Sequence, residues 1–297
     1  MNIGIIINPK SGRNKAFQLA KECEILLNHR EHTTSVVHTQ ELQEDDRVWS
    51  CDRLIIIGGD GTVHHTLPNL IRHQIPFYHL ATGTANLIAT ELKMPKSPAA
   101  AARWIEQGGQ ADFDVPTLDS VPFLVMCCLG MDAGVIHRFE HRRTRSGGLR
   151  NYIRPVLNEI LHPKPAHIRI TVDERELGIK SPMNLVIANM RSYAQGINPC
   201  PNADPTDSIL DLLAAPCSTT VGWSIHTLFN RFRINIPRSQ RLLASTITIM
   251  GVSKPTVVQI DGEVATTPIL RHGILEPHQS ITLQIGQHRV PIITPPL

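Results

Sequence analysis

The sequence predicts a two-domain chain, with an N-terminal α/β domain built on a parallel sheet and a C-terminal antiparallel β-sandwich. From residue 1 to about 115, short apolar runs alternate with stretches of helical spacing. After Asp112–Pro116 the helical stretches become few, and short strands follow one another. The length of 297 residues is sufficient for two domains. We therefore expect domains at 1–115 and 116–287.

The first domain is expected to alternate strands with helices, and this order produces a parallel sheet covered on both faces. The predicted strands are Ile3–Ile7, Ser35–His38, Leu54–Ile57 and Phe77–Leu80, and the predicted helices are Lys15–Asn28, Val63–His73, Ala85–Leu92 and Ala99–Gln107.

The second domain is expected to consist mainly of strands, and Gly147–Leu161 is its clearest helix. The predicted strands are Phe123–Cys128, Ala166–Val172, Asn184–Ala188, Leu210–Ala214, Ser245–Met250, Thr256–Ile260, Ser280–Ile285 and Val290–Ile293.

Composition excludes several classes of protein. No apolar run approaches 18 residues, so a transmembrane helix is not expected. The N-terminus has no basic start and is interpreted as a strand, not a signal peptide. The six cysteines lack CxxC spacing, which favours reduced thiols in a cytoplasmic protein. A net charge of +3 does not indicate nucleic-acid binding.

The most informative stretch is Leu54–Thr62, in which Gly58, Gly59, Asp60 and Gly61 follow an apolar strand. A strand, a glycine turn and a helix present backbone N–H groups and the positive end of a helix to an anion. A carboxylate beside a phosphate needs a cation between them, so Asp60 suggests a nucleotide handled with Mg²⁺. A tight turn with a solvated acid is the alternative, and this motif alone leaves both interpretations open.

Two further polar loops follow predicted strands. Asn8–Asn14 comes after the first strand, and Ala81–Asn86 comes after the strand that ends at Leu80. Ligands of parallel α/β sheets bind beyond the carboxyl ends of the strands, where such loops gather. Three loops in this arrangement favour a phosphate-binding crevice over three unrelated turns.

The motifs resemble those of the diacylglycerol kinase catalytic-domain family, which includes sphingosine kinases and bacterial lipid kinases. They are Asn8–Gly12 (NPKSG), Gly58–Thr62 (GGDGT), Gly83–Asn86 (GTAN), Gly130–Ala133 (GMDA) and Ile260–Glu263 (IDGE), in the order that the family has. NAD kinases and phosphofructokinase-like enzymes share GGDGT or a close variant, whereas NPKSG and DGE favour the lipid kinases. The resemblance implies that ATP and lipid meet between the domains, and it admits a last strand, near 288–297, that completes the first domain.

The resemblance also implies roles for individual residues. The ATP-binding residues would be Asn8, Pro9, Ser11, Gly12, Thr39, Gly58, Gly59, Gly61, Thr62, Gly83, Thr84 and Asn86. Asp60 would organise Mg²⁺ around the phosphates and take part in catalysis. Asp261 corresponds to the acid proposed as general base on the lipid hydroxyl, and Glu263 lies two residues on, on the same side of an extended segment. The alternative for these two acids is a hairpin turn, because Asp-Gly is a strong hairpin signal.

The stretch Asn202–Asp211 resembles an acidic loop that binds a structural Mg²⁺ in some bacterial members of the family. Asp204 and Asp207, with a backbone carbonyl near Ile209, are oxygen ligands of the kind that a hard cation takes. Ser208 stands where the family usually has glycine, which narrows the backbone options of this loop.

A second departure from the family pattern is Leu87, where many diacylglycerol kinase relatives have an acid. A water or metal network that relied on that acid would have to be rebuilt, and Asp114 is the candidate. This departure weakens a specific diacylglycerol assignment more than it weakens kinase activity.

Two basic clusters suggest that the protein binds peripherally to the membrane that contains its lipid substrate. Their members are Arg138, Arg142, Arg143, Arg145, Arg150 and Arg154 in the first cluster, and Arg231, Arg233, Arg238 and Arg241 in the second. Solvated basic loops are the alternative. The sequence leaves open whether the chain forms a homodimer.

The function predicted from these observations is an ATP- and Mg²⁺-dependent lipid kinase of the cytoplasm. Its expected acceptor is the hydroxyl of diacylglycerol, phosphatidylglycerol or a long-chain base. Two alternatives remain, an NAD-kinase-type enzyme that phosphorylates a soluble hydroxyl and a non-catalytic lipid- or nucleotide-binding protein of the same fold. The retained acids Asp60, Asp261 and Glu263 favour an active enzyme.

Overall fold

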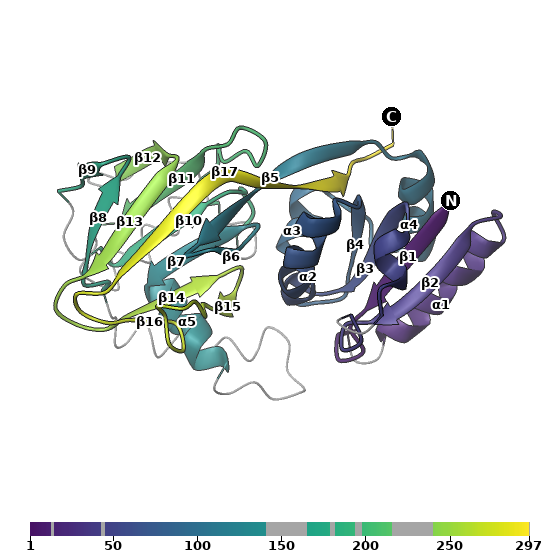
Figure 1. Ribbon diagram of the computed structural model, residues 1–297, viewed down its shortest axis with the longest axis horizontal. Helices are drawn as coiled ribbons and strands as arrows, with labels where there is room; N and C mark the ends of the chain where they lie inside the picture. Colours follow the sequence, from purple (N-terminus) through teal and green to yellow (C-terminus); the bar gives the residue numbers. More distant parts are fainter. Residues whose placement is uncertain are drawn as a thin grey trace. The chain divides into compact units, whose positions relative to one another are not determined.

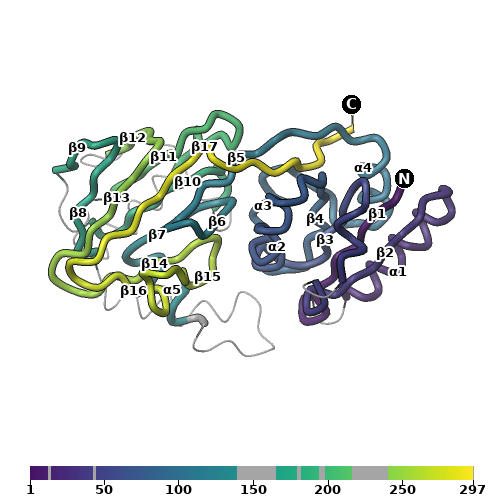
Figure 2. Tube along the Cα trace, viewed as in Figure 1, coloured from purple at the N-terminus to yellow at the C-terminus, as the bar shows by residue number. Residues whose placement is uncertain are grey.

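The computed structural model describes residues 1–12, 15–42, 45–140, 165–178, 182–193, 198–215 and 240–296. Its contacts divide the chain into unit 1, Met1–Phe113 with His288–Leu297, and unit 2, Asp114–Gln287 (Figures 1 and 2). The predicted helix Gly147–Leu161 and most of both basic clusters lie outside the described residues.

Unit 1 is built on a parallel sheet, which confirms the predicted fold class. Its strands are β1 (Asn2–Ile7), β2 (Thr33–His38), β3 (Arg53–Gly58) and β4 (Phe77–Ala81), in the order β2-β1-β3-β4. The end of β17 (Ser280–Ile293) pairs in parallel with β4 through Ile292 and Phe77. The central strands are apolar because helices cover both faces of the sheet.

The helices of unit 1 are α1 (Lys15–Asn28), the 3₁₀ helix η2 (Arg47–Ser50), α2 (Asp60–His73), α3 (Leu87–Glu91) and α4 (Pro98–Gln107). Helices α1 and α4 pack together on one face of the sheet, and α2 and α3 cover the other (Figure 1). Helix α2 begins at Asp60 instead of Val63, because extended Gly59 already accepts the N–H of Thr62. Helix α3 begins at Leu87 instead of Ala85, because Asn86 takes a left-handed φ of 54°.

Unit 2 contains two largely antiparallel sheets, as a β-sandwich requires. The first sheet contains β5 (Gln110–Leu118), β6 (Val121–Pro122), β8 (Ile168–Val172), β9 (Arg175–Glu176), β13 (Thr246–Gly251) and β17. The second contains β7 (Met126–Gly130), β10 (Asn184–Ala188), β11 (Leu210–Ala215), β12 (Gln240–Ala244), β14 (Thr256–Ile260), β15 (Glu263–Val264) and β16 (Ile274–Leu275). Buried side chains of both sheets form one core, which includes Leu129, Ile187, Ile249 and Leu283.

Several elements of unit 2 differ from the prediction. Strand β7 begins at Met126 instead of Phe123, because the N–H groups of Leu124 and Val125 donate to the side chain of Asp261 and not to the backbone of a neighbouring strand. The two strands expected at 280–285 and 290–293 are one strand, β17, which pairs with β13 at its start and with β4 near its end. Helix α5 (Met131–Glu140) and strand β5 were not predicted.

Among the described helices, none combines the length and the apolar composition that crossing a bilayer would need. The described cysteines are all buried and form no disulfide with one another. Burial raises the pKa of Cys23 to about 12, so this thiol remains protonated at neutral pH.

Candidate functional site

The three polar loops that follow β1, β3 and β4 are joined to one another by hydrogen bonds. Asn8 Nδ2 donates to Thr62 Oγ1 across 3.0 Å, which links the first loop to the start of α2. The hydroxyls of Ser11 and Thr82 lie 2.8 Å apart, and the N–H of Thr82 donates to the carbonyl of Gly58 at 2.8 Å. The loops therefore gather at one edge of the parallel sheet, as expected for a ligand site of this fold.

Close backbone approach explains the glycines of these loops. A Cβ added to Gly83 would lie 2.7 Å from the Cα of Gly59 and 2.9 Å from Asn86 Oδ1. A Cβ on Gly58 would lie 2.3 Å from Thr62 Oγ1. Only glycine allows the turn after β3 and the loop after β4 to touch in this way.

Asp60 and Asn86 place polar atoms at these turns. Asp60 is the first residue of α2, where the helix dipole favours a carboxylate, and its Oδ1 lies 3.4 Å from the N–H of Ile88 in α3. Asn86 is buried and donates from Nδ2 to the carbonyl of Gly83 at 2.8 Å. Its Oδ1 has no hydrogen-bond partner among the described residues, so a ligand group that donates a hydrogen could be bound there.

The other predicted nucleotide residues of unit 1 differ in exposure and conformation. Thr84 is exposed, whereas Pro9 and Gly61 are half-buried. Gly12 has a left-handed φ of 62°, and a Cβ there would lie 2.9 Å from Thr82 Cβ. Each of these residues therefore belongs to, or borders, the joined loops.

His79 is a residue of this site that sequence reasoning missed. It is fully buried in β4, and its Nε2 lies 3.1 Å from the carbonyl of Gly58, at the start of the glycine turn. Burial lowers the pKa of His79, and the charge of Asp60 opposes that shift. The neutral ring can donate to Gly58, which helps to fix the turn. The available signal was one polar residue within the apolar strand Phe77–Ala81.

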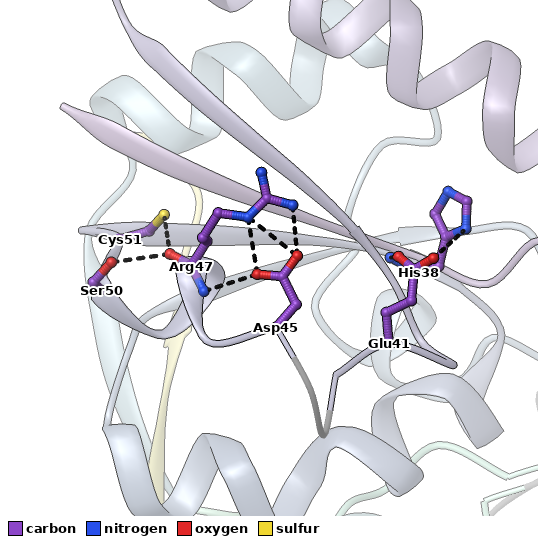
Figure 3. A network of polar contacts seen from close by, with 6 residues as sticks. All are labelled: His38, Glu41, Asp45, Arg47, Ser50 and Cys51. Carbon is purple, nitrogen blue, oxygen red and sulfur yellow. Dashed lines mark hydrogen bonds and ion pairs between the residues drawn. The ribbon is translucent and has the colours of Figure 1, made fainter.

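Thr39, the remaining predicted nucleotide residue, follows β2 and donates its N–H to the carbonyl of Ile7 at 2.9 Å. It therefore lies next to the loop that begins at Asn8. The connection that follows carries a polar network (Figure 3), in which Arg47 Nε lies 2.9 and 3.1 Å from the carboxylate oxygens of Asp45. This hydrogen bond lowers the pKa of Asp45. The network in Figure 3 comprises His38, Glu41, Asp45, Arg47, Ser50 and Cys51.

In unit 2, Asp261 lies in the tight turn between β14 and β15. Asp261 and Gly262 have positive φ values of 50° and 81°, which is the conformation of a two-residue hairpin turn. The hairpin interpretation of this motif therefore holds, but the acid is not solvated, because Asp261 is only 5% exposed. Glu263, in β15, is half-buried.

The carboxylate of Asp261 binds the backbone just before β7. Its Oδ2 accepts the N–H of Leu124 at 2.8 Å. Its Oδ1 accepts the N–H of Val125 at 2.8 Å and that of Met126 at 3.1 Å. Both oxygens of this predicted catalytic acid are thus committed to the fold of unit 2.

The acidic loop uses its carboxylates locally. Asp204 Oδ1 accepts the N–H of Thr206 at 3.0 Å, and Asp207 Oδ1 accepts the N–H of Ile209 at 2.9 Å. Partial desolvation raises the pKa of Asp207, and the nearby charges of Asp204 and Asp114 act in the same direction. Among the described residues, no three His, Cys, Asp or Glu side chains are arranged to hold a metal ion. Two exposed carboxylates and a carbonyl remain a donor set that Mg²⁺ can share with water.

Ser208, which stands where the family usually has glycine, adopts the backbone conformation that glycine favours. It takes a left-handed φ of 59°, which glycine adopts more readily. Its N–H donates to Asp114 Oδ2 at 2.8 Å, and its Oγ lies 3.2 Å from Asp114 Oδ1. These bonds to a fully buried carboxylate offset the backbone cost of about 1 kcal/mol. Asp114 is therefore engaged with the acidic loop.

The GMDA motif builds the start of α5. A Cβ on Gly130, whose φ is 92°, would lie 2.5 Å from the carbonyl of Met183. Asn184 receives the N–H of Asp132 at 3.3 Å and donates to its carboxylate at 2.5 Å. Burial raises the pKa of Asp132, while hydrogen bonds from Tyr193 and Asn184 oppose the shift. This motif therefore fixes a helix start against β10.

Comparisons with known proteins agree with this arrangement. The family model described as the diacylglycerol kinase catalytic domain matches residues 2–118. A second, described as the YegS C-terminal NAD kinase beta sandwich-like domain, matches residues 125–278.

Individual relatives are similar at low sequence identity. A diacylglycerol kinase of Mycobacterium tuberculosis is 28% identical over 222 residues, which cover 71% of this chain and 72% of that protein. Sphingosine kinase B of Dictyostelium discoideum is 27% identical over 138 residues, which cover 40% of this chain and 18% of that protein. A solved structure of a diacylglycerol kinase from Bacillus anthracis str. Sterne has a TM-score of 0.73 at 18% identity, covering 99% of this chain and 97% of that one.

Together the two family models match residues in both units, and the two relatives named above are a diacylglycerol kinase and a sphingosine kinase. A kinase of this kind is a phosphotransferase that takes phosphate from a nucleotide and uses an alcohol group as acceptor. From its motifs, its fold and these matches, we conclude that this chain belongs to the diacylglycerol kinase catalytic-domain family.

Proposed function

We propose that this protein is a lipid kinase that transfers the γ-phosphate of ATP, in the presence of Mg²⁺, to the hydroxyl of a membrane lipid. The observation that carries the proposal is the joining of three loops in unit 1, with Asp60 at the start of the 14-residue helix α2. Backbone N–H groups and a helix N-terminus attract phosphate, and phosphoryl transfer depends mainly on positioning and charge neutralisation.

The residues of unit 1 fit a nucleotide. Gly59 and Gly83 leave room where a Cβ would clash, so the backbone can approach the phosphates closely. The Oδ1 atom of Asn86 is an acceptor that a ribose hydroxyl or a metal-bound water would satisfy. Asp60 would hold Mg²⁺, which when bound neutralises negative charge on the transferred phosphate.

The proton of the lipid hydroxyl needs an acceptor on unit 2. Asp261 is a poor candidate, because its two oxygens accept three backbone N–H groups. Glu263 follows two residues later and is more accessible to solvent. We assign proton acceptance to Glu263, and we assign to Asp261 the role of holding the turn that presents it.

The acidic loop is the candidate for a structural Mg²⁺. Asp204 and Asp207 would hold the ion with the carbonyl of Ile209, and the retained conformation of Ser208 supports this fit. The ion would relieve the repulsion from Asp204 and Asp114, which adds to desolvation in raising the pKa of Asp207.

Three lipids are proposed as acceptors. Similarity to a diacylglycerol kinase of M. tuberculosis supports diacylglycerol as the acceptor, and similarity to sphingosine kinase B of D. discoideum supports a long-chain base. Phosphatidylglycerol is the third. A lipid substrate also implies contact with a membrane surface, for which the two arginine-rich clusters are the proposed docking elements.

The test is transfer of radiolabelled γ-phosphate from ATP and Mg²⁺ to these lipids in mixed micelles, beside NAD and sugar phosphates. Label in a lipid supports the proposal and identifies the acceptor, whereas label only in NAD or a sugar phosphate contradicts it. ATP binding without transfer to any acceptor would indicate a non-catalytic binding protein.

The assignment of the proton acceptor is tested with Glu263→Gln and Asp261→Asn. Glu263→Gln should lower kcat by at least about a hundredfold with little change in melting temperature, because a general base contributes about 10²–10⁴ in rate. Asp261→Asn should lower both kcat and the melting temperature. If folded Asp261→Asn loses all activity while Glu263→Gln retains it, the two roles are reversed.

A further inference from the structure

The segment Leu124–Met126 has all of its backbone polar groups bound by the ends of two neighbouring strands. In the second sheet of unit 2, β7 lies between β10 and β14. The segment consists of Met126, the first residue of β7, and the two residues before it, and it lies where β10 ends at Ala188 and β14 ends at Ile260. The residue that follows each neighbour, Asn189 or Asp261, therefore flanks the segment.

Asp261 binds one side of this segment. Its carboxylate accepts the N–H groups of Leu124, Val125 and Met126, and its own N–H donates to the carbonyl of Met126 at 2.9 Å. The carbonyls of Leu124 and Val125 remain, and a buried carbonyl without a donor is costly.

Asn189 satisfies these two carbonyls. Its Nδ2 donates to the carbonyl of Leu124 at 2.8 Å, and its backbone N–H donates to that of Val125 at 2.9 Å. Asn189 is 0% exposed, so water does not compete for these bonds. Asp261 and Asn189 thus hold the segment from opposite sides.

Asn189 also connects this segment to the acidic loop. Its Nδ2 donates a second hydrogen bond, at 2.8 Å, to the carbonyl of Asp114. The side chain of Asp114 accepts the N–H of Ser208 in the acidic loop. A continuous chain of hydrogen bonds therefore runs from the acidic loop through Asp114 and Asn189 to the segment that Asp261 binds.

We infer that Asn189 is a positioning residue for phosphate transfer. Asn189 holds Leu124–Met126 in position, and the turn at Asp261 is bound to this segment. Asn189 therefore also determines the position of Glu263. No substrate contact is assigned to Asn189. The inference rests on the proposed function, because the turn that it orients carries the proposed proton acceptor. A neutral amide suits this role, because it donates to two carbonyls without placing another charge near Asp114 and Asp261.

The test begins with amide hydrogen exchange in the wild-type protein and in Asn189→Ser. We expect the amides of Leu124, Val125 and Met126 to be protected in the wild type and to exchange at least tenfold faster in the variant. Wild-type amides that exchange as fast as those of exposed loops would overturn the inference. Asn189→Asp keeps the volume and removes the donated side-chain hydrogens, and it gives the same test if the serine variant does not fold.

The matched control is Asn184→Ser, because Asn184 is also a buried asparagine and begins β10, whereas Asn189 follows the other end of that strand. We expect this control to lower the melting temperature while the protection of Leu124–Met126 stays at the wild-type level. Loss of protection in both variants would indicate general loosening of the sheet, which contradicts a specific role for Asn189.

Kinetics then separate positioning from stability. In Asn189→Ser, measured well below its melting temperature, kcat should fall at least tenfold and the acid limb of its pH profile should move, while KM for ATP stays within twofold. A wild-type kcat and pH profile in this variant would overturn the inference. If the wild-type protein transfers phosphate to no acceptor, the proposed function fails, and the exchange experiment still tests whether Asn189 holds the segment.

Discussion

The polar motifs of the two units are used in different ways. In unit 1 the side chains of Asn8, Ser11 and Thr62 bond mainly within the loops that follow the parallel strands. In unit 2 the carboxylates of Asp173 and Asp261 accept backbone N–H groups from other segments. The first arrangement joins the loops in which the nucleotide site is proposed, and the second holds strands and turns together. A motif acid can therefore be a structural acceptor and need not be a reacting group.

This difference predicts where substitutions affect chemistry and where they affect folding. The loops of unit 1 are closely packed but keep acceptors such as Asn86 Oδ1 without a described partner. The carboxylate of Asp261 accepts three backbone N–H groups and is buried. Changes in unit 1 should mainly affect nucleotide use, whereas changes at Asp261 should also affect the stability of unit 2.

The largest effect is expected for Asp60→Asn in unit 1. Loss of the carboxylate that would hold Mg²⁺ should lower kcat by at least about a hundredfold, because charge neutralisation is a major term in phosphoryl transfer. Activity is measured by γ-phosphate transfer, and folding by circular dichroism. Asp52→Asn, which removes the charge of an exposed carboxylate that accepts the N–H of Asn2, serves as the control in the same unit. Near-normal activity in Asp60→Asn would contradict the assignment of Asp60.

The next effect is a loss of stability in Asp261→Ala. Three N–H groups would lose a buried acceptor, so the free energy of unfolding should fall by about 3 kcal/mol. Asp173→Ala is the comparison, since Asp173 likewise accepts backbone N–H groups, two instead of three, but is exposed. Because water can replace that acceptor, its cost should be about 1 kcal/mol or less. Equal losses in urea denaturation would show that burial is not what distinguishes the two turns.

A smaller and more local effect is expected for Gly83→Ala. The added Cβ would lie 2.7 Å from the Cα of Gly59 and would push apart two loops of the proposed nucleotide site. ATP affinity, measured by calorimetry, should fall about tenfold, which corresponds to about 1.4 kcal/mol. Gly178→Ala is the control, because nothing lies within 4 Å of a Cβ there. Unchanged affinity in Gly83→Ala would place the nucleotide elsewhere.

The smallest effect is a pH dependence in unit 2 that arises from Asp211. Desolvation, together with the charge of Asp207, raises the pKa of Asp211 from its ordinary 3.8 to about 6, although Arg241 opposes the shift. The folded state therefore binds this proton more tightly than the unfolded chain does, and the associated stability is lost as the pH rises from about 4 to about 6. With allowance for solvent screening, this contribution is about 1 kcal/mol. Urea denaturation of Asp211→Asn should lack this part of the pH dependence, and an unchanged profile would contradict the assignment.

Local patterns predicted much of the fold. Apolar runs bounded by polar turns predicted β1, β3 and β4, because buried parallel strands consist of such residues. The same approach missed β5, because Asp112–Pro116 was interpreted as the boundary between the two domains. Asp114 is tolerated in a buried strand because Ser208, 94 residues further along the chain, donates to it. No local pattern contains that partner.

The sequence also predicted part of the candidate site. The three polar loops that follow β1, β3 and β4 could be expected to gather, because the topology of a parallel sheet brings the carboxyl ends of its strands together. The contributions of His79 and Asn189 could not be expected, since each depends on contacts with residues distant in the sequence. The only local signal was a polar residue in or next to an apolar strand.

The sequence alone determined the fold class, the order of the motifs and the family, because these follow from local periodicity and from short stretches such as GGDGT. The tertiary structure decided how the acids are used. Asp261 meets Leu124 across 137 residues of chain, and only the pairing of β14 beside β7 brings this carboxylate to those backbone amides. A hydrogen bond depends on the position and direction of both groups, and for residues so far apart these are set by the packing of the sheet.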